Sequence, residues 1–312
     1  MARPVKGHQA AANAFVPLPT RDGVAPSYLW LTETRAGGML RFLVERFPDV
    51  SEAAWVARLA RGEIVDATGV PLNADSQVRQ GMRIWYYREL EQPETRIPFQ
   101  ERVLFQDQHL LVADKPHFLP TIPTGRFLKE TLLVRLKRAH DLPHLVPIHR
   151  LDRETAGVVI FSHNPDSRGA YQSMFQKRVV KKTYEALAGV MAGRTFPFTY
   201  RSRMQDAAQF FVSEEVAGEP NSETLIELLE QRGNVARYRL HPHTGRKHQL
   251  RLHLSKLGAP ILNDAFYPVA LPCKGDDFAS PLQLLARSIA FDDPLTGQPR
   301  SFDSALALDW PE

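Results

Sequence analysis

Large apolar residues in the first third of the chain recur with a helical period in two short stretches. Between residues 36 and 47 they lie three or four positions apart, which predicts one face of a helix that Pro48 ends. Ser51 has the side chain of a helix N-cap, so a second helix is predicted to run to about Arg61 and to end at Gly62.

Short apolar runs at 64–65 and 82–87 predict a small β-ribbon after these helices. Helices and ribbon together predict a compact unit at residues 33–90. Residues 1–32 contain four prolines and no clear period, so we expect an irregular arm. Residues 91–100 are polar with two prolines and are expected to form a linker.

From residue 101 onwards, predicted strands and helices mix without a fixed repeat. The predicted strands are 103–105, 110–113, 158–161, 182–188, 224–230 and 235–240, of which the last two are expected to pair. The predicted helices are 128–139, 165–176 and 248–257, the last ended by Gly258. Because regular βαβ alternation is missing, the pattern favours an α+β fold over a doubly wound α/β fold.

Composition supports a folded protein of about two domains. The chain has 312 residues, 43% of them hydrophobic and 24% charged, which excludes disordered, collagen-like and disulfide-stapled classes. A single cysteine, Cys273, cannot form an internal disulfide and fits a reducing compartment. The sequence shows neither a run of about 18 apolar residues nor an apolar signal core at its N-terminus, so we expect a cytoplasmic protein without a membrane segment.

Charge is distributed unevenly although the net charge is only +4. Residues 126–182 contain 12 Lys/Arg and 5 Asp/Glu, and residues 232–256 contain 7 Lys/Arg and no acid. Each segment therefore carries +7, which leaves −10 for the rest of the chain. This separation predicts a basic face for a polyanion, and solvated surface is the alternative interpretation.

The segment 149–157, HRLDRETAG, places an aspartate between two arginines just before an apolar strand. A carboxylate at the rim of a basic groove can act as nucleophile or base. A salt-bridged turn is the alternative, and the charge pattern alone favours it.

The segment 243–253, HTGRKHQLRLH, predicts a turn at Gly245 followed by a helix. A helix N-terminus beside Arg246 and Lys247 is an anion site, and Lys247 and Arg251 are expected to share a helical face. A solvated helical face is the alternative.

Metal chemistry is not expected in this region. Four histidines lie close together in sequence, but no cysteine or carboxylate lies among them, and the nearby cations would repel a metal ion; the histidines are His241, His243, His248 and His253.

Together these segments resemble the RluA-type pseudouridine synthase family. HRLDRETAG and HTGRKHQLRLHLSKLGAPILNDAFY carry the resemblance, with KRVVKKTYEALAGV (177–190) similar to the family's tyrosine motif and LLARSIAFDDPLTGQPRSF similar to its closing segment. The motifs occur in the family's order over about residues 100–305. The resemblance implies a catalytic domain at 101–312 with a mixed, largely antiparallel sheet flanked by helices. It also implies isomerisation of uridine to pseudouridine in RNA, and it reverses the preference for a salt-bridged turn at Asp152.

The resemblance also implies roles for individual residues. Asp152 matches the catalytic aspartate, which attacks the sugar, attacks the base or abstracts the 2′ proton; the sequence leaves these routes open. Tyr184 matches the tyrosine that stacks on the base, Arg251 the partner of the aspartate, and Arg150 the residue that fills the place of the flipped uridine. By periodicity alone Tyr184 could instead be a core residue, and His149, His248 and His253 are expected to be structural.

Other implied features concern the pocket and RNA contacts. Leu250 or Leu252 is a candidate for the pocket wall, and no metal or organic cofactor is implied. The candidates for phosphate contacts are Lys181, Lys182, Arg246 and Lys247.

Residues 33–90 resemble the S-four-like RNA-binding module that precedes this domain in many members. The match is loose, because residues 66–69 replace the usual Asn-Gly turn and Met82 follows Gly81 where Asp is common. In the catalytic segment, Asn263-Asp264 stands where Gly-Asp is common and Leu285 where the family often has His.

We therefore predict a monomeric RNA pseudouridine synthase that acts on uridines in rRNA or tRNA, with residues 115–127 a candidate for RNA selection. A non-catalytic RNA-binding protein that retains the fold is the second hypothesis. A different uracil-directed enzyme, such as a base-removing one, is the third.

Overall fold

The computed structural model describes residues 15–90, 92–208, 211–271 and 277–311, so Cys273 lies outside the described residues. The helices are α1 (Gly38–Arg46), α2 (Glu52–Ala60), α3 (Leu132–His140), α4 (Pro165–Lys177) and α5 (Gln249–Lys256). The strands are β1 (Ser27–Trp30), β2 (Ile64–Val65), β3 (Arg83–Tyr86), β4 (Arg102–Gln106), β5 (Leu110–Lys115), β6 (Val146–Pro147), β7 (Ala156–Ser162), β8 (Lys181–Gly189), β9 (Phe198–Asp206), β10 (Ser213–Val216), β11 (Ser222–Arg232), β12 (Val235–Pro242), β13 (Leu284–Asp292) and β14 (Pro299–Asp303). In these described ranges, no helix has the length and apolarity needed to cross a membrane.

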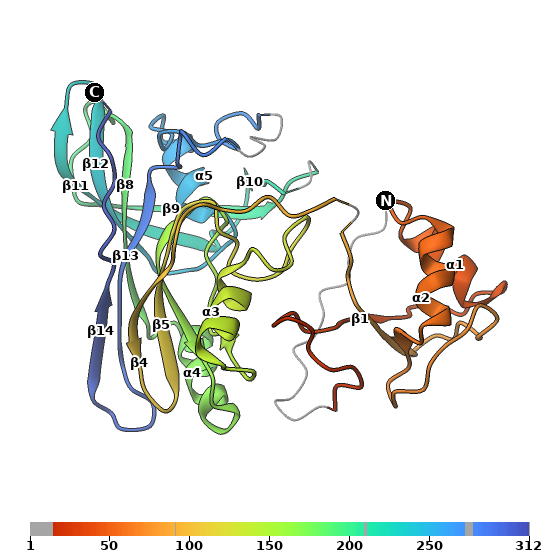
Figure 1. Cartoon of the computed structure of the whole chain (residues 1–312). Coiled ribbons are helices and arrows are strands. Elements are labelled where there is room, and N and C mark those ends of the chain that lie inside the picture. Colours follow the sequence, from red (N-terminus) through yellow and green to blue (C-terminus); the bar gives the residue numbers. More distant parts are fainter. Residues whose placement is uncertain (1–14, 91, 209–210, 272–276, 312) are drawn as a thin grey trace.

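The N-terminal part is a three-stranded antiparallel sheet, in the order β1-β3-β2, covered on one face by α1 and α2 (Figure 1). The two helices lie where their apolar periods predict them. The Ser51 side chain caps α2 by accepting a hydrogen bond from the Ala54 N–H at 3.3 Å. Met39, Leu43 and Trp55 from the helices are buried against the sheet.

Strand β1 corrects the expectation of an irregular arm over the whole of residues 1–32. It pairs with β3 in the register Ser27↔Tyr86, and Leu31 just after it is buried in the same core. Four residues are too few to show a period in the sequence, and the partner strand lies far along the chain. These residues therefore form a strand because they pair with β3, and the local sequence pattern does not show this pairing.

The segment expected to be a linker packs against the C-terminal part. Ile97 is fully buried in the core there, and the Glu94 carboxylate accepts hydrogen bonds from backbone N–H groups, including that of Lys129 at 2.9 Å. These contacts hold residues 128–130 outside the helix. Helix α3 consequently begins at Leu132, four residues later than its apolar pattern predicts, with Thr131 as its N-cap.

The C-terminal part contains an eleven-stranded sheet in the order β10-β9-β11-β12-β8-β13-β7-β5-β4, with β14 beside β13 and β6 beside β7. Every neighbouring pair is antiparallel except β13 and β7, which are parallel. In Figure 1, α3 and α4 lie beside β5 and α5 lies near β9 and β10. The α+β prediction is confirmed, as is the antiparallel pairing of 224–230 with 235–240.

The parallel contact between β7 and β13 explains the glycine of the HRLDRETAG motif. Gly157 has φ +113°, and a Cβ atom there would lie 2.2 Å from the carbonyl oxygen of Ala286. Any larger residue would push the two strands apart. Since β7 is buried along its whole length, this close approach fixes the point at which the motif loop enters the sheet.

Candidate active site

Asp152 lies in the loop that connects β6 to β7, just before the central strand β7 begins. Its side chain is 32% exposed, so the carboxylate is open to solvent while the surrounding backbone is ordered. The Thr155 N–H donates to the Asp152 carbonyl oxygen at 3.2 Å and closes a turn around the motif. An accessible carboxylate on a fixed turn is able to meet a substrate.

The last residue of β5 and the segment after it hold this loop on both sides of Asp152. The fully buried Lys115 ammonium donates to the carbonyl oxygens of Pro116, Leu119 and Arg153 at 3.0, 2.7 and 2.9 Å. Burial lowers the pKa of Lys115 to about 7, against the opposing charges of the nearby carboxylates. On the other side, the Thr121 hydroxyl donates to the Leu151 carbonyl at 2.9 Å.

The two arginines that flank Asp152 in sequence point to different places. The Arg150 side chain lies on the exposed surface. Arg153 turns into the 115–127 segment, where its Nε donates to the Phe118 carbonyl at 3.0 Å and its guanidinium lies 5.0 Å from the Phe127 ring. The segment that we expected to select RNA thus contacts the Asp152 loop directly.

The cation beside Asp152 comes instead from α5. Arg251 is only 1% exposed, and its Nη1 lies 3.4 Å from Asp152 Oδ2. Its closer partner is Asp264, which accepts from Nε at 2.8 Å and from Nη2 at 2.5 Å. Burial alone would lower the pKa of Arg251, but the hydrogen bonds and charge of Asp264 outweigh it and raise that pKa.

Sequence reasoning did not identify Asp264 as a site residue. The available signal was the pair Asn263-Asp264 in the place of Gly-Asp. Asn263 has φ 62°, in the left-handed region that glycine and asparagine adopt at least cost. Asn263 therefore preserves the turn, and the aspartate after it anchors Arg251.

Tyr184 on β8 is brought to the same place from the sheet. Its ring packs against both large hydrophobic clusters of the C-terminal part. Tyr184 therefore contributes to the core, although its side chain is only partly buried. Burial raises the pKa of its phenol, and the negative charge of Asp152 raises it further. The hydroxyl is therefore protonated while Asp152 is a free carboxylate.

Leu250 and Leu252 of α5 and Leu285 of β13 belong to different parts of the core. Leu250 lies in the cluster against which Tyr184 packs, whereas Leu252 packs with Met204 on β9. Leu285 is fully buried in β13 and pairs with Ala156.

Burial lowers the pKa of three motif histidines, His149, His248 and His253. His149 accepts a hydrogen bond from the Ile160 N–H at 3.1 Å, and burial lowers its pKa to about 3. His253 lies within 3.1 Å of three hydroxyl groups, and burial lowers its pKa to about 4; the hydroxyls belong to Ser202, Ser222 and Thr224. His248 differs, because its Nε2 lies 3.8 Å from Asp152 Oδ2.

The four candidate phosphate contacts fall into two groups. Lys182 shares a face of β8 with Tyr184, and its Nζ reaches the Thr244 carbonyl at 3.5 Å, whereas Lys181 is exposed on the opposite face. Arg246 and Lys247 are exposed in the turn before α5. Because this helix begins at Gln249, the prediction that Lys247 shares a helical face with the buried Arg251 is wrong.

Folding cancels much of the charge separation seen along the sequence. Five of the seven basic residues in 232–256 form ion pairs with carboxylates: Arg232 with Glu230, Arg237 with Glu185, Arg239 with Glu227, Lys247 with Asp206 and Arg251 with Asp264. The basic surface formed by residues 232–256 is therefore smaller than the sequence indicates.

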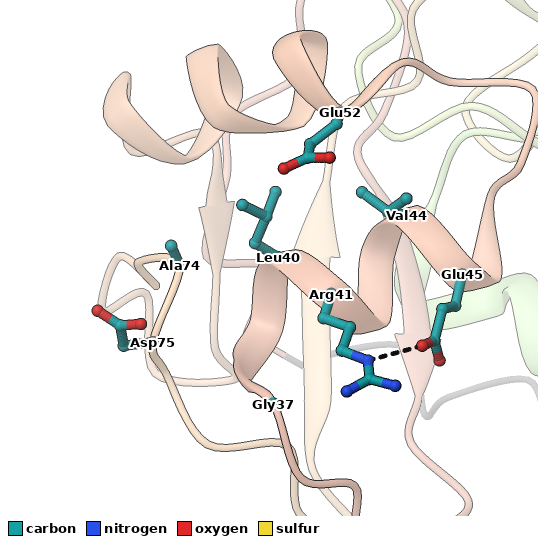
Figure 2. A pocket seen from close by; sticks show the side chains of 8 residues that line it. All are labelled: Gly37, Leu40, Arg41, Val44, Glu45, Glu52, Ala74 and Asp75. Atoms are coloured by element: carbon teal, nitrogen blue, oxygen red, sulfur yellow. Dashed lines mark hydrogen bonds and ion pairs between the residues drawn. The ribbon is translucent and has the colours of Figure 1, made fainter.

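The N-terminal module does not have the charge of a typical RNA-binding surface. Residues 33–90 contain eight Lys/Arg and eight Asp/Glu. A hollow of about 360 Å³ lies beside α1. Apolar Leu40 and Val44 and three carboxylates surround it (Figure 2). Its one cation, Arg41, already pairs with Glu45 at 2.8 Å. This hollow contains none of the residues gathered around Asp152.

Comparison with known proteins agrees with this arrangement. The sequence pattern of the RNA pseudouridylate synthase family matches residues 109–256, which include Asp152, Tyr184 and Arg251. An RNA pseudouridine synthase of Synechocystis sp. is 27% identical, over 73% of this chain and 79% of the relative. The structure of human RNA pseudouridylate synthase domain containing 1 aligns with a TM-score of 0.55 at 22% identity, over 66% of this chain and 83% of that chain, which supports the fold.

A second relative establishes the family. The dual-specificity RNA pseudouridine synthase RluA of Salmonella typhi is 31% identical, over 64% of this chain and 90% of its own length. With nearly the whole of that enzyme aligned, and with the family's fold around Asp152, the chain belongs to the RluA-type family of RNA pseudouridine synthases.

Proposed function

We propose that the chain converts specific uridines of rRNA or tRNA to pseudouridine, with Asp152 as the catalytic aspartate. The observation that carries this proposal is the meeting of an accessible carboxylate, a buried arginine 3.4 Å from it and a partly buried tyrosine on a central strand of the sheet.

The reaction breaks the bond between ribose C1′ and uracil N1 and forms a bond between C1′ and C5. The C5 proton leaves and N1 gains a proton, so no electrons are exchanged. Asp152 takes part by attacking C1′, by attacking the ring or by removing the 2′ proton. Arg251 keeps the carboxylate in place, and Arg150 on the surface is suited to occupy the position that the flipped uridine leaves.

Tyr184 is suited to the last proton transfer. Burial raises the pKa of the phenol, and while Asp152 is a free carboxylate its charge raises that pKa further. When Asp152 forms a bond or takes up a proton, it loses its negative charge and no longer raises the pKa of the phenol. The phenol then becomes a better acid–base group for the C5 proton. The timing of that change fits a role after the glycosidic bond is broken.

Lys182, Arg246 and Lys247 are proposed to contact phosphates around the flipped uridine, and Lys181 to contact RNA farther away. The proposal includes a monomeric enzyme in the cytoplasm, where rRNA and tRNA substrates would be found. RNA binding by residues 33–90 remains an expectation from the sequence, and the balanced charge of that module does not strengthen it.

Mapping pseudouridine in total rRNA and tRNA from cells with and without this gene tests the substrate. We expect at least one site in rRNA or tRNA to be lost on deletion and to be restored in vitro by the purified chain. If deletion removes no site and the purified chain forms none on either RNA, the proposal is wrong. Release of free uracil instead of pseudouridine would support the base-removing alternative.

A further inference from the structure

We infer that His248 is a positioning residue for Asp152, with a neutral imidazole whose Nε2–H is directed at the carboxylate oxygen Oδ2. This inference rests on the proposed role of Asp152 as the catalytic carboxylate. It assigns a function to the histidine of the HTGRKHQ segment that sequence reasoning treated as structural.

The carboxylate oxygen Oδ2 lies between two nitrogen groups from the start of α5. His248 Nε2 is 3.8 Å from Oδ2, and Arg251 Nη1 is 3.4 Å from the same atom. Catalytic hydrogen bonds are often long without substrate and shorten in the complex. Because both groups lie next to Oδ2, the second carboxylate oxygen, Oδ1, is the one left to contact the sugar or the base.

The imidazole ring is fixed more firmly than a surface histidine. Its side chain is 8% exposed, against 32% for Asp152. The ring stacks on Phe266 at a centroid distance of 5.4 Å and an interplanar angle of 18°, and it meets the Tyr267 ring edge-on at 5.8 Å. The backbone of His248 has φ 56°, an uncommon conformation that the surrounding packing must maintain.

The hydroxyl group of Tyr267 lies beside the other ring nitrogen of His248. It accepts a hydrogen bond from the Ser213 N–H at 2.8 Å, and it lies 3.1 Å from His248 Nδ1 and 3.2 Å from the Ser213 carbonyl oxygen. If the hydroxyl proton is donated to Nδ1, the ring carries its proton on Nε2 and presents it to Asp152. If it is donated to Ser213, the lone pair of Nε2 faces the carboxylate and repels it.

The negative charge of Asp152 therefore selects the tautomer with Nε2–H. The doubly protonated ring is disfavoured, because burial lowers the pKa of His248 to about 4 in spite of the nearby Asp152. Arg251 thus supplies the positive charge at Asp152, and His248 supplies a directed, uncharged donor. Together they fix the orientation of the carboxylate plane, which a single contact would leave free to rotate.

Three variants test this role by kcat and KM for a substrate RNA. His248→Phe keeps a ring for stacking but has no donor, and we expect kcat to fall about 100-fold with KM changed less than about twofold. His248→Gln carries an N–H at a similar reach, and we expect it to recover at least about tenfold of that loss. Tyr267→Phe should lower kcat in the wild-type background and have no further effect in the His248→Phe background.

The tautomer has an independent readout. In ¹H–¹⁵N spectra of protein labelled at histidine, we expect the His248 signals of the Nε2–H form in the wild type and a mixture of tautomers in Tyr267→Phe. If the wild-type protein instead gives the signals of the Nδ1–H form, the inference is overturned. Full activity of His248→Phe would also overturn it, as would an equal loss of kcat in the Phe and Gln variants or an additive effect of Tyr267→Phe.

Asp152→Asn in the same assay separates this inference from the proposed function. If Asp152→Asn is inactive and His248→Phe is fully active, only the inference about His248 fails. If Asp152→Asn is active, the proposed function itself fails, whatever the result at His248.

Discussion

Arg251 binds Asp264 through two hydrogen bonds, at 2.8 and 2.5 Å, and approaches Asp152 through one longer contact of 3.4 Å. The Asp264 pair is buried, with side chains 1% and 0% exposed. The arginine is thus anchored by the buried carboxylate of Asp264. Asp152 gains an adjacent cation without being locked into a buried pair, and it stays free to react.

Asp264→Asn tests the anchor. Removing one member of a buried ion pair leaves the other charge uncompensated, so we expect the free energy of unfolding to fall by about 3–5 kcal/mol. Activity should fall as well, because Arg251 loses its orientation. Asp166→Asn, at the exposed start of α4, is the control and should change stability by less than about 0.5–1 kcal/mol. Equal stability of the two variants in denaturant titrations would contradict this account.

Gly157→Ala tests the close contact of β7 and β13. The added methyl group would lie 2.2 Å from the Ala286 carbonyl oxygen in a backbone conformation with φ +113°. We expect a loss of stability of about 3 kcal/mol or more, together with loss of activity, since the loop that carries Asp152 enters the sheet at this point. The matched control is Gly169→Ala in α4, where a methyl group meets nothing within 4 Å and should stabilise the helix slightly. Thermal melts that rank the two variants in the opposite order would refute the prediction.

The lowered pKa of the buried His253 predicts how the free energy of unfolding depends on pH. Its pKa is about 4 in the folded protein, against about 6.5 in an unfolded chain, so the unfolded state binds an additional proton between these values. Stability due to the neutral ring is complete above pH 6.5 and is lost as the pH falls towards 4, at about 1.4 kcal/mol per pH unit. His253→Gln should reduce the slope of unfolding free energy against pH by about that amount between pH 6 and 5. An unchanged slope in urea titrations would show that the ring does not stay neutral.

We expect Arg246 to contribute to the salt dependence of RNA binding. Its side chain is exposed in the turn before α5, so we expect Arg246→Gln to weaken RNA binding and to lower the slope of log K against log salt by about one. Arg239→Gln is the matched control, because Arg239 lies on β12 next to Glu227 and should not change the slope. Fluorescence anisotropy over a range of salt concentrations measures both. If the two variants have the same slope, Arg246 is not a phosphate contact.

The sequence predicted most elements of the fold because their apolar periods are local. Helices α1, α2 and α4 and the pairing of β11 with β12 follow from such periods and from caps such as Ser51. Strand β1 could not be predicted this way, since its identity depends on a partner more than 50 residues along the chain. The late start of α3 likewise depends on Glu94, which binds residues 128–130 from the preceding segment.

The candidate site likewise contains residues that the sequence could predict and residues whose roles depend on the folded structure. The segments around Asp152, Tyr184 and Arg251 were recognisable as motifs, and the structure places the three side chains together. The roles of Asp264 and Lys115 were not recognisable, because each depends on contacts made only in the folded chain. The expected basic face was overestimated for the same reason, since net charge along a segment does not show which arginines meet carboxylates from elsewhere.

The most direct test of the central claim measures tritium release from RNA labelled at uracil C5, since that hydrogen leaves when C5 bonds to the ribose. We predict that Asp152→Asn, which keeps the shape of the side chain, folds like the wild type and binds RNA but releases no tritium above background. Asp166→Asn should release tritium at the wild-type rate. Tritium release by Asp152→Asn at a rate near that of the wild type would contradict the assignment of Asp152 as the catalytic residue.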